Sequence, residues 1–251
     1  MGIFFALVRR ELGIAFNALT GYVVVSFSLL LAGFGLMDLM VRLNSDRTDA
    51  PITEMFFSEG LIFWLILILM TPVITMRSFA AEKALGTYES LMTAPVGDWQ
   101  VVLAKFTGAF LFFLLSWLPM FGVLIGLRQV TGQTEFLDPL ALGGSILGIA
   151  FLGGTYLSAG LFASSLTRSQ IIAAMISLLI GIGVWASSLR PDTGALGSER
   201  WGRILDHISV THHMVDFARG MIDGRAVVFH LSVTIFFLFL THRVVETRRW
   251  K

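Results

Sequence analysis

The chain has 251 residues, of which 55% are hydrophobic and 14% charged, and its mean hydropathy is +0.79. Soluble domains average about 45–50% apolar and about 25% charged residues, so this composition predicts an integral membrane protein and excludes a large water-soluble core. The net charge of +1 offers no bulk attraction for nucleic acid, and the absence of cysteine excludes disulfides, thiolate metal sites and thiol redox chemistry.

The N-terminal stretch, residues 1–19, is expected to form an interfacial helix. Its apolar residues recur at helical spacing beside two arginines, a pattern typical of a helix that lies on a membrane. A cleaved signal peptide is the alternative, but Glu11 interrupts the stretch and no small-x-small cleavage site precedes the first span. The apolar face consists of Phe5, Val8, Leu12, Ala15 and Phe16, and the arginines are Arg9 and Arg10.

Six later segments are long and apolar enough to cross a hydrocarbon core about 30 Å thick, which takes roughly 20 helical residues. We therefore predict an all-α integral membrane protein whose single transmembrane domain covers residues 1–251. The expected spans are residues 20–40, 56–76, 104–127, 140–164, 170–189 and 226–241.

The distribution of lysine and arginine predicts the orientation of these spans. The short loops on the side opposite the N terminus contain only Arg42, Arg47 and Arg128, so the positive-inside rule places both termini in the cytoplasm. Residues 77–103 are then cytoplasmic and residues 190–225 external. Within the external segment, apolar residues at helical spacing predict a short amphipathic helix that ends at Gly224. Its apolar positions are Met214, Phe217, Ala218 and Met221.

Few residues in the spans could carry chemistry. Asp38, Glu59 and His230 lie near span ends, where we interpret them as interfacial groups that reach toward water. His212 and His213 are adjacent and lack the i, i+4 spacing by which two imidazoles share a metal. The sequence contains no G-x-x-x-x-G-K-[ST] phosphate loop and no convincing set of nucleophile and base. The chain is therefore expected not to be an enzyme, and to bind no metal or cofactor itself.

Small residues recur along the fourth and fifth expected spans. In lipid, helices associate where small side chains let their backbones approach, as in the G-x-x-x-G pattern. Two roles for these small residues stay open: they pack helices closely within one chain, or they line a path between two copies of the chain. The residues are Gly144, Gly148, Gly154 and Ser158 in the fourth span and Ser177 and Gly181 in the fifth.

The polar stretch EKALGTYESLMTAPVGDWQVVLAK, residues 82–105, interrupts two apolar segments. Gly86 weakens the first helix, Thr87 can cap a new short helix with Glu89 near its positive end, Pro95 stops that helix, and Asp98 caps the next. A simple turn needs only a few residues. We therefore predict a rigid, doubly bounded helix that docks into a cytoplasmic partner; a solvated hairpin that merely extends the spans is the alternative.

The same stretch carries a family resemblance. It matches the E-[KR]-x-x-G-T-x-E-x-L-x-x-x-P-V pattern of the cytoplasmic loop in ABC-2 type transporter permeases, particularly their gliding-motility-related (GldF-like) branch. Residues 216–250 resemble that branch's F-x-R-G-x-I-D-x-R-x-x-x-[FY] run, last span and basic tail, with Ala226 as a departure because relatives often carry an acid there. The matching residues of the first pattern are Glu82, Lys83, Gly86, Thr87, Glu89, Leu91, Pro95 and Val96.

The resemblance implies a permease subunit of an ATP-driven transporter in the bacterial cytoplasmic membrane, which works for export. Two permease halves, identical or different, form the pathway, separate ATP-binding subunits hold ATP and Mg, and an auxiliary membrane subunit is possible. Short external or re-entrant helices follow the fifth span. The residues implied in ATPase coupling are Glu82, Lys83, Gly86, Thr87, Tyr88, Glu89, Leu91, Met92, Pro95 and Val96.

Two other classes stay open on the sequence alone. One is a force-transmitting membrane subunit of an ABC-type envelope or motility assembly that moves no solute itself. The other is a stand-alone channel or an ion-coupled carrier, which disagrees with the lack of charged residues at mid-membrane depth.

Overall fold

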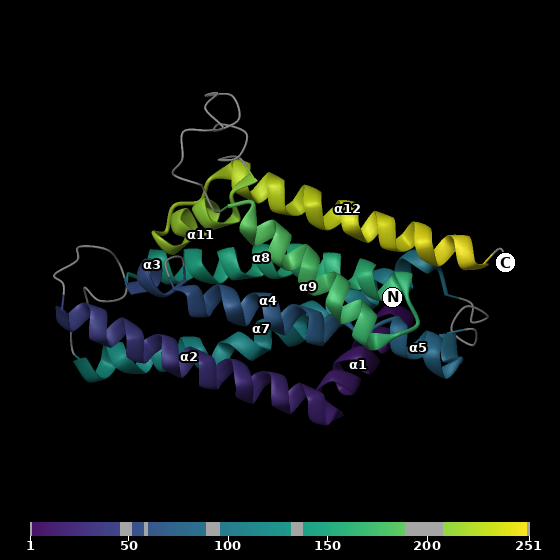
Figure 1. Ribbon diagram of the computed structural model, residues 1–251, viewed down its shortest axis with the longest axis horizontal. Coiled ribbons are helices and arrows are strands. Elements are labelled where there is room, and N and C mark those ends of the chain that lie inside the picture. Colours follow the sequence, from purple (N-terminus) through teal and green to yellow (C-terminus); the bar gives the residue numbers. More distant parts are fainter. Residues whose placement is uncertain are drawn as a thin grey trace.

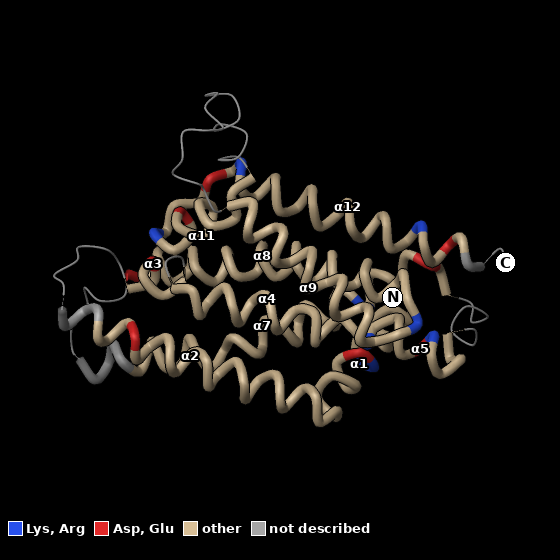
Figure 2. Tube along the Cα trace, viewed as in Figure 1, with Lys and Arg blue, Asp and Glu red and all other residues tan. Residues whose placement is uncertain are grey.

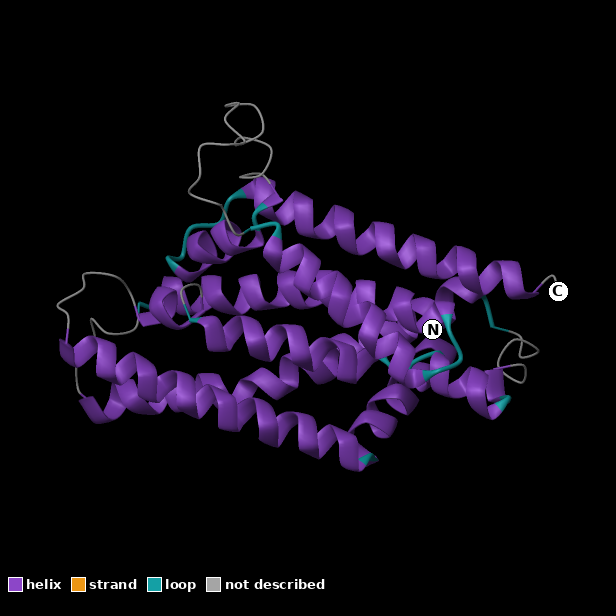
Figure 3. Cartoon of the chain, viewed as in Figure 1, coloured by secondary structure: helices purple, strands orange, loops and turns teal. Residues whose placement is uncertain are grey.

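The computed structural model describes residues 2–45, 52–57, 60–88, 96–131, 138–188 and 208–249. Every regular element in this part of the chain is a helix (Figure 3). The long helices run along the longest axis of the molecule and form one bundle (Figure 1). In chain order they are α1 (Gly2–Asn17), α2 (Leu19–Ser45), α3 (Ile52–Phe57), α4 (Leu61–Thr75), α5 (Ala80–Leu85), α7 (Asp98–Thr131), α8 (Pro139–Leu166), α9 (Gln170–Ala186), α11 (Val210–Ala218) and α12 (Gly224–Arg249).

Five helical stretches among the described residues are long and apolar enough to cross a membrane. They are Leu19–Val41, Leu61–Leu85, Asp98–Gly126, Pro139–Leu166 and Gly224–Thr247. The fifth expected span corresponds to α9, which has 17 residues. The all-helical membrane fold is therefore confirmed, whereas the count of six spans stays a prediction.

The second expected span, residues 56–76, is interrupted near its start. Phe56 and Phe57 belong to the short helix α3, and α4 begins only at Leu61, after Gly60 has taken an extended conformation with ψ 108. The interruption is stabilised by aromatic contacts, because the ring of Phe57 lies 5.6 Å from Phe63 and 5.7 Å from Phe121. The predicted span ran across Ser58, Glu59 and Gly60, the three residues that separate α3 from α4.

The helix predicted around Met214 also ends earlier than expected. α11 stops at Ala218, and Gly220 adopts the left-handed conformation with φ 79. Gly224, the predicted end, is instead the first residue of α12. Met214, Phe217 and Ala218, three of the four predicted apolar positions, are buried, but Met221 lies beyond the helix and is exposed. Gly220 ends the helix because glycine takes a positive φ without strain from a side chain.

His230 is not the water-facing group that the sequence predicted. It is fully buried in α12, and its Nδ1 lies 3.0 Å from Oγ1 of Thr155 in α8. The ring of His213 lies 5.3 Å away. A buried polar ring needs a partner, and the hydroxyl of Thr155 supplies one. Asp38 is exposed as expected, and Glu59 lies outside the described residues.

Charged residues gather toward the two ends of the bundle, and its central part is almost free of them (Figure 2). This distribution is what a hydrocarbon layer across the middle requires, because burying a charge in lipid is costly. The start of α1, the end of α12 and α5 lie toward one end, while α3 and α11 lie at the other (Figure 1).

Candidate functional site

The functional candidate is the turn of chain that follows α4, residues 76–88, which we call the α5 segment. α4 ends at Thr75, α5 begins at Ala80, and Gly86 ends α5 with φ 73, a left-handed conformation that favours glycine. The hydroxyl of Thr87 donates back to the carbonyl oxygen of Glu82 at 3.4 Å. The break predicted at Gly86 therefore exists. Most of the helix predicted over residues 88–94 lies outside the described residues.

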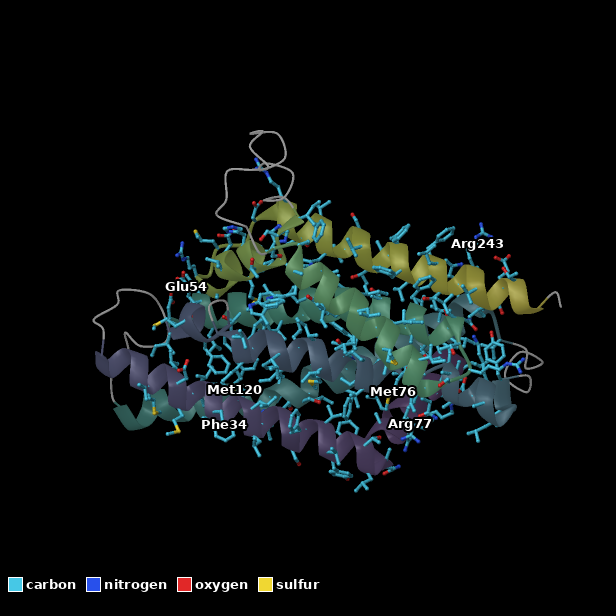
Figure 4. The ribbon with its side chains drawn as sticks, viewed as in Figure 1. Phe34, Glu54, Met76, Arg77, Met120 and Arg243 are labelled. Atoms are coloured by element: carbon cyan, nitrogen blue, oxygen red, sulfur yellow. The ribbon has the colours of Figure 1, made fainter. Side chains whose placement is uncertain are left out.

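Ser164, near the end of α8, holds the start of the α5 segment. Its hydroxyl donates to the carbonyl oxygen of Met76 and accepts from the amide groups of Phe79 and Ala80, each at 3.1 Å. One side chain thus satisfies three backbone groups that the turn between α4 and α5 leaves without helical partners. Figure 4 shows Met76 and Arg77 at this end of the bundle, far from Glu54.

Lys83 provides the second attachment to α8. Its Nζ donates to the carbonyl oxygen of Ser165 and lies 5.3 Å above the ring of Tyr88. Both side chains are buried. A lysine at the C-terminal end of a helix also complements the partial negative charge of the last carbonyl groups.

Glu82 is the centre of a charge cluster that joins the α5 segment to α1 and α7. Its Oε1 accepts from Arg10 at 3.0 Å and from Lys105 at 2.8 Å. Oε1 of Glu11 accepts from the same two cations, at 2.8 Å and 3.2 Å. Gly108 on α7 permits this approach, because a side chain there would meet Cβ of Glu11 at 2.7 Å. We call Arg10, Glu11, Glu82 and Lys105 the four-charge cluster.

Burial makes the four-charge cluster consequential for stability. The side chain of Lys105 is 2% exposed, and those of Glu11 and Glu82 are 13% and 18% exposed. A buried ion loses its hydration, so these three side chains depend on their partners, whereas Arg10 is 42% exposed. Partial burial by itself lowers the pKa of Arg10, but the hydrogen bonds and charges of Glu11 and Glu82 outweigh it and raise that pKa.

A small apolar core lies beneath the α5 segment. Phe79 and Tyr88 pack edge to face at 6.5 Å. Val96, the first described residue after Tyr88, packs against this core. At the same end, the ring of Trp99 stacks on that of His242 at 4.3 Å, which joins the start of α7 to α12. The core consists of Phe79, Tyr88, Val101, Val102, Leu161, Leu238 and Val245.

The opposite end of the bundle has its own ion pair. Arg219, which follows α11, contacts Glu54 of α3 through two bonds: Nε to Oε2 at 2.8 Å and Nη2 to Oε1 at 2.5 Å. The hydroxyl of Thr53 donates to the carbonyl oxygen of Ala218 at 2.7 Å. A two-bond arginine–carboxylate pair fixes orientation as well as distance. The arginine of the F-x-R-G run therefore joins the two short helices α3 and α11.

Small residues of α8 and α9 make close contacts within the chain. A methyl group on Gly144 would overlap the carbonyl oxygen of Phe217, and one on Gly148 would lie 2.8 Å from Cβ of Phe217. α11 therefore packs directly against both glycines. Gly154 faces Thr234 of α12 at 3.5 Å. Ser158 and Ser177 are buried, and Gly181 faces Tyr156 at 3.3 Å. A path lined by these residues between two copies stays a prediction.

The structure brings Glu82, Lys83, Gly86, Thr87, Tyr88 and Val96 together around the α5 segment. Glu89, Leu91, Met92 and Pro95 lie outside the described residues. Sequence reasoning missed Arg10, Glu11, Lys105 and Ser164. The one available signal was that Lys105 is an isolated charge beside a long apolar run, where an unpaired ion is costly.

Replacing Ser164 with alanine is expected to loosen the α5 segment. The change leaves two buried amide groups and one carbonyl oxygen without the hydroxyl, at a cost of about 1–3 kcal/mol in the free energy of unfolding. Ser165→Ala is the matched control, because that hydroxyl donates only within its own helix, to Phe162 at 2.7 Å. Thermal unfolding in detergent should separate the two variants, and equal melting temperatures would contradict the role of Ser164.

The fold and the site together define a multi-pass helical membrane protein with a short polar segment bound across three helices at one end. Residues 39–241 match the model of a family described as ABC-2 family transporter protein. The chain belongs to that family, and is accordingly the membrane component of an ABC transporter and not its nucleotide-hydrolysing domain. ABC-2 permeases as a class work with an ABC ATP-binding partner. A search of curated proteins found no match.

Proposed function

We propose that the chain is a permease subunit that forms the pathway as a dimer, identical or mixed, and exports its cargo across the bacterial cytoplasmic membrane. Separate ATP-binding subunits, which hold ATP and Mg, dock at the α5 segment. The observation that carries this proposal is the attachment of the α5 segment to α1, α7 and α8 through Glu82 and Ser164. A segment that only connected two spans would need no such attachments.

The attachments suit the segment to transmit movement. When the ATP-binding subunits close, they displace the α5 segment, and its contacts carry the displacement into α8 through Ser164 and into α1 and α7 through Glu82. ATP then shifts the population of the helical bundle between two states to the extent that it binds one of them more tightly. The residues of the predicted coupling helix, 88–94, would form the surface that the partner contacts.

We further propose six crossings with both termini in the cytoplasm. α9 has 17 residues, so it is about 25 Å long at about 1.5 Å per residue, close to the thickness of a thin bilayer core. α2 begins and α12 ends toward the same end of the bundle (Figure 1). An even number of crossings is required for that arrangement, and α9 supplies the sixth. Within the family, we assign the chain to the gliding-motility-related branch, whose members work with an auxiliary membrane subunit. The two sequence patterns support this finer assignment.

Gly86 offers the test of the proposal. The chain is purified in nanodiscs with the ATP-binding subunit that copurifies with it, and ATP hydrolysis is measured. The parent chain is expected to stimulate ATP hydrolysis by that subunit. Gly86→Val is expected to lose most of this stimulation, because a β-branched residue is strained at φ 73. Gly86→Asn is the control, because asparagine tolerates the left-handed conformation and should retain most of the stimulation. Equal ATPase rates for both variants and the parent, or no copurifying ATPase, would contradict the proposal.

A further inference from the structure

Two hollows of different character meet between α1, α2, α4 and α7. The first is a cavity of about 420 Å³ next to the α5 segment, within the size range of about 300–1,000 Å³ that small-molecule sites have. The second is an apolar groove of about 220 Å³ between α2 and α4. Val24 and Val73 line both, so the cavity and the groove are adjacent.

The cavity is charged at one side and apolar at the other. Three cations and two carboxylates line it, which leaves one positive charge in excess: Arg10, Arg77, Lys105, Glu11 and Glu82. Four of these five belong to the four-charge cluster and neutralise one another. Arg77 is the remaining cation. It is exposed, and its Nη1 donates to the hydroxyl of Thr20 at 3.1 Å. Among the described residues, no carboxylate forms an ion pair with Arg77.

The groove has the opposite chemistry. Its walls are aliphatic and aromatic apart from the hydroxyl of Ser28, which is engaged with the carbonyl oxygen of Val25 at 2.9 Å. From Val73 to Ile66 the groove follows α4 for about 10 Å, at about 1.5 Å per residue, away from the charged end of the bundle. It therefore runs into the region that hydrocarbon surrounds. The residues are Val24, Phe27, Ser28 and Leu31 of α2 and Ile66, Leu69, Met70 and Val73 of α4.

We propose that these two hollows form a binding site for one anionic glycerophospholipid. Its phosphate binds Arg77 and the hydroxyl of Thr20 in the cavity, and one of its acyl chains lies in the groove between α2 and α4. The guanidinium of an arginine matches a phosphate with two parallel hydrogen bonds. A free phosphate would leave the apolar groove unfilled, whereas a phospholipid matches both halves and their order along the membrane depth. The excess positive charge selects an anionic headgroup over a zwitterionic one.

The site also has a consequence for the α5 segment. Arg77 and Ser78 belong to this segment, and Thr87 contributes to the same cavity. A bound phospholipid therefore contacts residues of the α5 segment other than Phe79, Ala80 and Lys83, which bind α8. The lipid would restrain that segment against α1 and α2.

Native mass spectrometry of the delipidated full-length chain tests the proposal. The chain is titrated with phosphatidylglycerol, with phosphatidylcholine of the same acyl chains, and with glycerol 3-phosphate. We expect phosphatidylglycerol to bind at least about fivefold more tightly than phosphatidylcholine, since one arginine contributes about 1 kcal/mol toward an anionic lipid. Glycerol 3-phosphate should bind far more weakly than either lipid. Equal binding of the two lipids, or full competition by glycerol 3-phosphate, would overturn the proposal.

Variants locate the bound lipid. Arg77→Gln should lose the preference for phosphatidylglycerol, while Arg9→Gln, an exposed arginine of α1 outside both hollows, should keep it. Val73→Phe closes the junction of the two hollows and should weaken both lipids. Should that variant fail to fold, Leu69→Trp narrows the groove at a residue that is already 39% exposed, and Leu231→Trp on α12 is its control.

A second copy of the chain is the other possible occupant of the groove. If a second copy fills the groove, the dimer binds no lipid at this site and Val73→Phe yields monomers. Those two observations together would exclude the lipid as the occupant. Lipid binding is measured without any ATP-binding subunit. A negative result here therefore leaves the proposed transport function standing, and a loss of ATPase coupling leaves this site standing.

Discussion

Reversing the charge of Glu82 or of Lys105 alone is expected to destabilise the protein and abolish ATPase coupling, and exchanging the two charges in one double variant is expected to restore part of both. Oε1 of Glu82 lies 2.8 Å from Nζ of Lys105, whose side chain is 2% exposed. Glu82→Lys places a third cation beside Arg10 and Lys105. Removing one partner of a buried ion pair typically costs about 3–5 kcal/mol, because the other charge stays buried without compensation.

The recovery in the double variant is partial for a structural reason. Two repulsive contacts persist after the exchange: the new carboxylate at position 105 stands where Nζ now lies 3.2 Å from Glu11, and the new ammonium at position 82 stands where the carboxylate now lies 3.0 Å from Arg10. A double-variant cycle of melting temperatures in detergent should still give an interaction energy of about 1–3 kcal/mol between the two positions. Arg9→Glu, an exposed reversal on α1, controls for charge at the membrane surface. Strictly additive losses in the cycle would show that the pair does not join α5 to α7.

Gly144→Ala is the second substitution with a large expected effect. The added methyl group would overlap the carbonyl oxygen of Phe217 and approach Cα of Gly220 to 3.0 Å. Both are backbone atoms, so no rotation of a side chain relieves the contact and α11 must move. Such overpacking typically costs about 1–3 kcal/mol in the free energy of unfolding. The displaced α11 would also weaken the pair between Glu54 and Arg219.

The neighbouring glycine provides the control. A methyl group on Gly143 meets nothing within 4 Å, so Gly143→Ala should change stability by less than about 1 kcal/mol. Because the sequence has no cysteine, Met214→Cys introduces a single thiol at a fully buried position of α11. Thiol reagents should modify it faster in the Gly144→Ala background than in the Gly143→Ala background. Equal modification rates and equal melting temperatures would contradict the contact between α8 and α11.

The sequence predicted features that depend on a few neighbouring residues. The long helices follow from apolar length, and the end of α5 at Gly86 follows from the conformational freedom of glycine. The close approach at Gly144 agrees with the small-residue pattern, although the pattern did not indicate that the partner would be α11. Local rules work here because each feature involves the backbone of one helix and its immediate surroundings.

The features that the sequence did not reveal depend on residues that are distant in the chain. Arg10 and Glu82 are separated by 72 positions, and Thr155 and His230 by 75. Neither pairing leaves a periodic signal. The break before Leu61 was missed because the long apolar run after Gly60 dominates the hydropathy of the span, although Ser58, Glu59 and Gly60 interrupt it. The end of α11 was placed at Gly224, six positions after Ala218, because Gly224 was taken as the terminating glycine, whereas Gly220 ends the helix.

α8 contacts α11 through Gly144 and the α5 segment through Ser164. Because α8 is one continuous helix, it fixes both the distance between these two contacts and their relative direction. The two residues are twenty positions apart, or about 30 Å at about 1.5 Å per residue. An α-helix keeps that length and turns about 100° per residue, so the two contacts point in correct directions only for one residue count between them. One inserted residue would leave both ends intact and turn one away from its partner. The spacing along α8 is therefore as much a part of the site as the side chains at its ends.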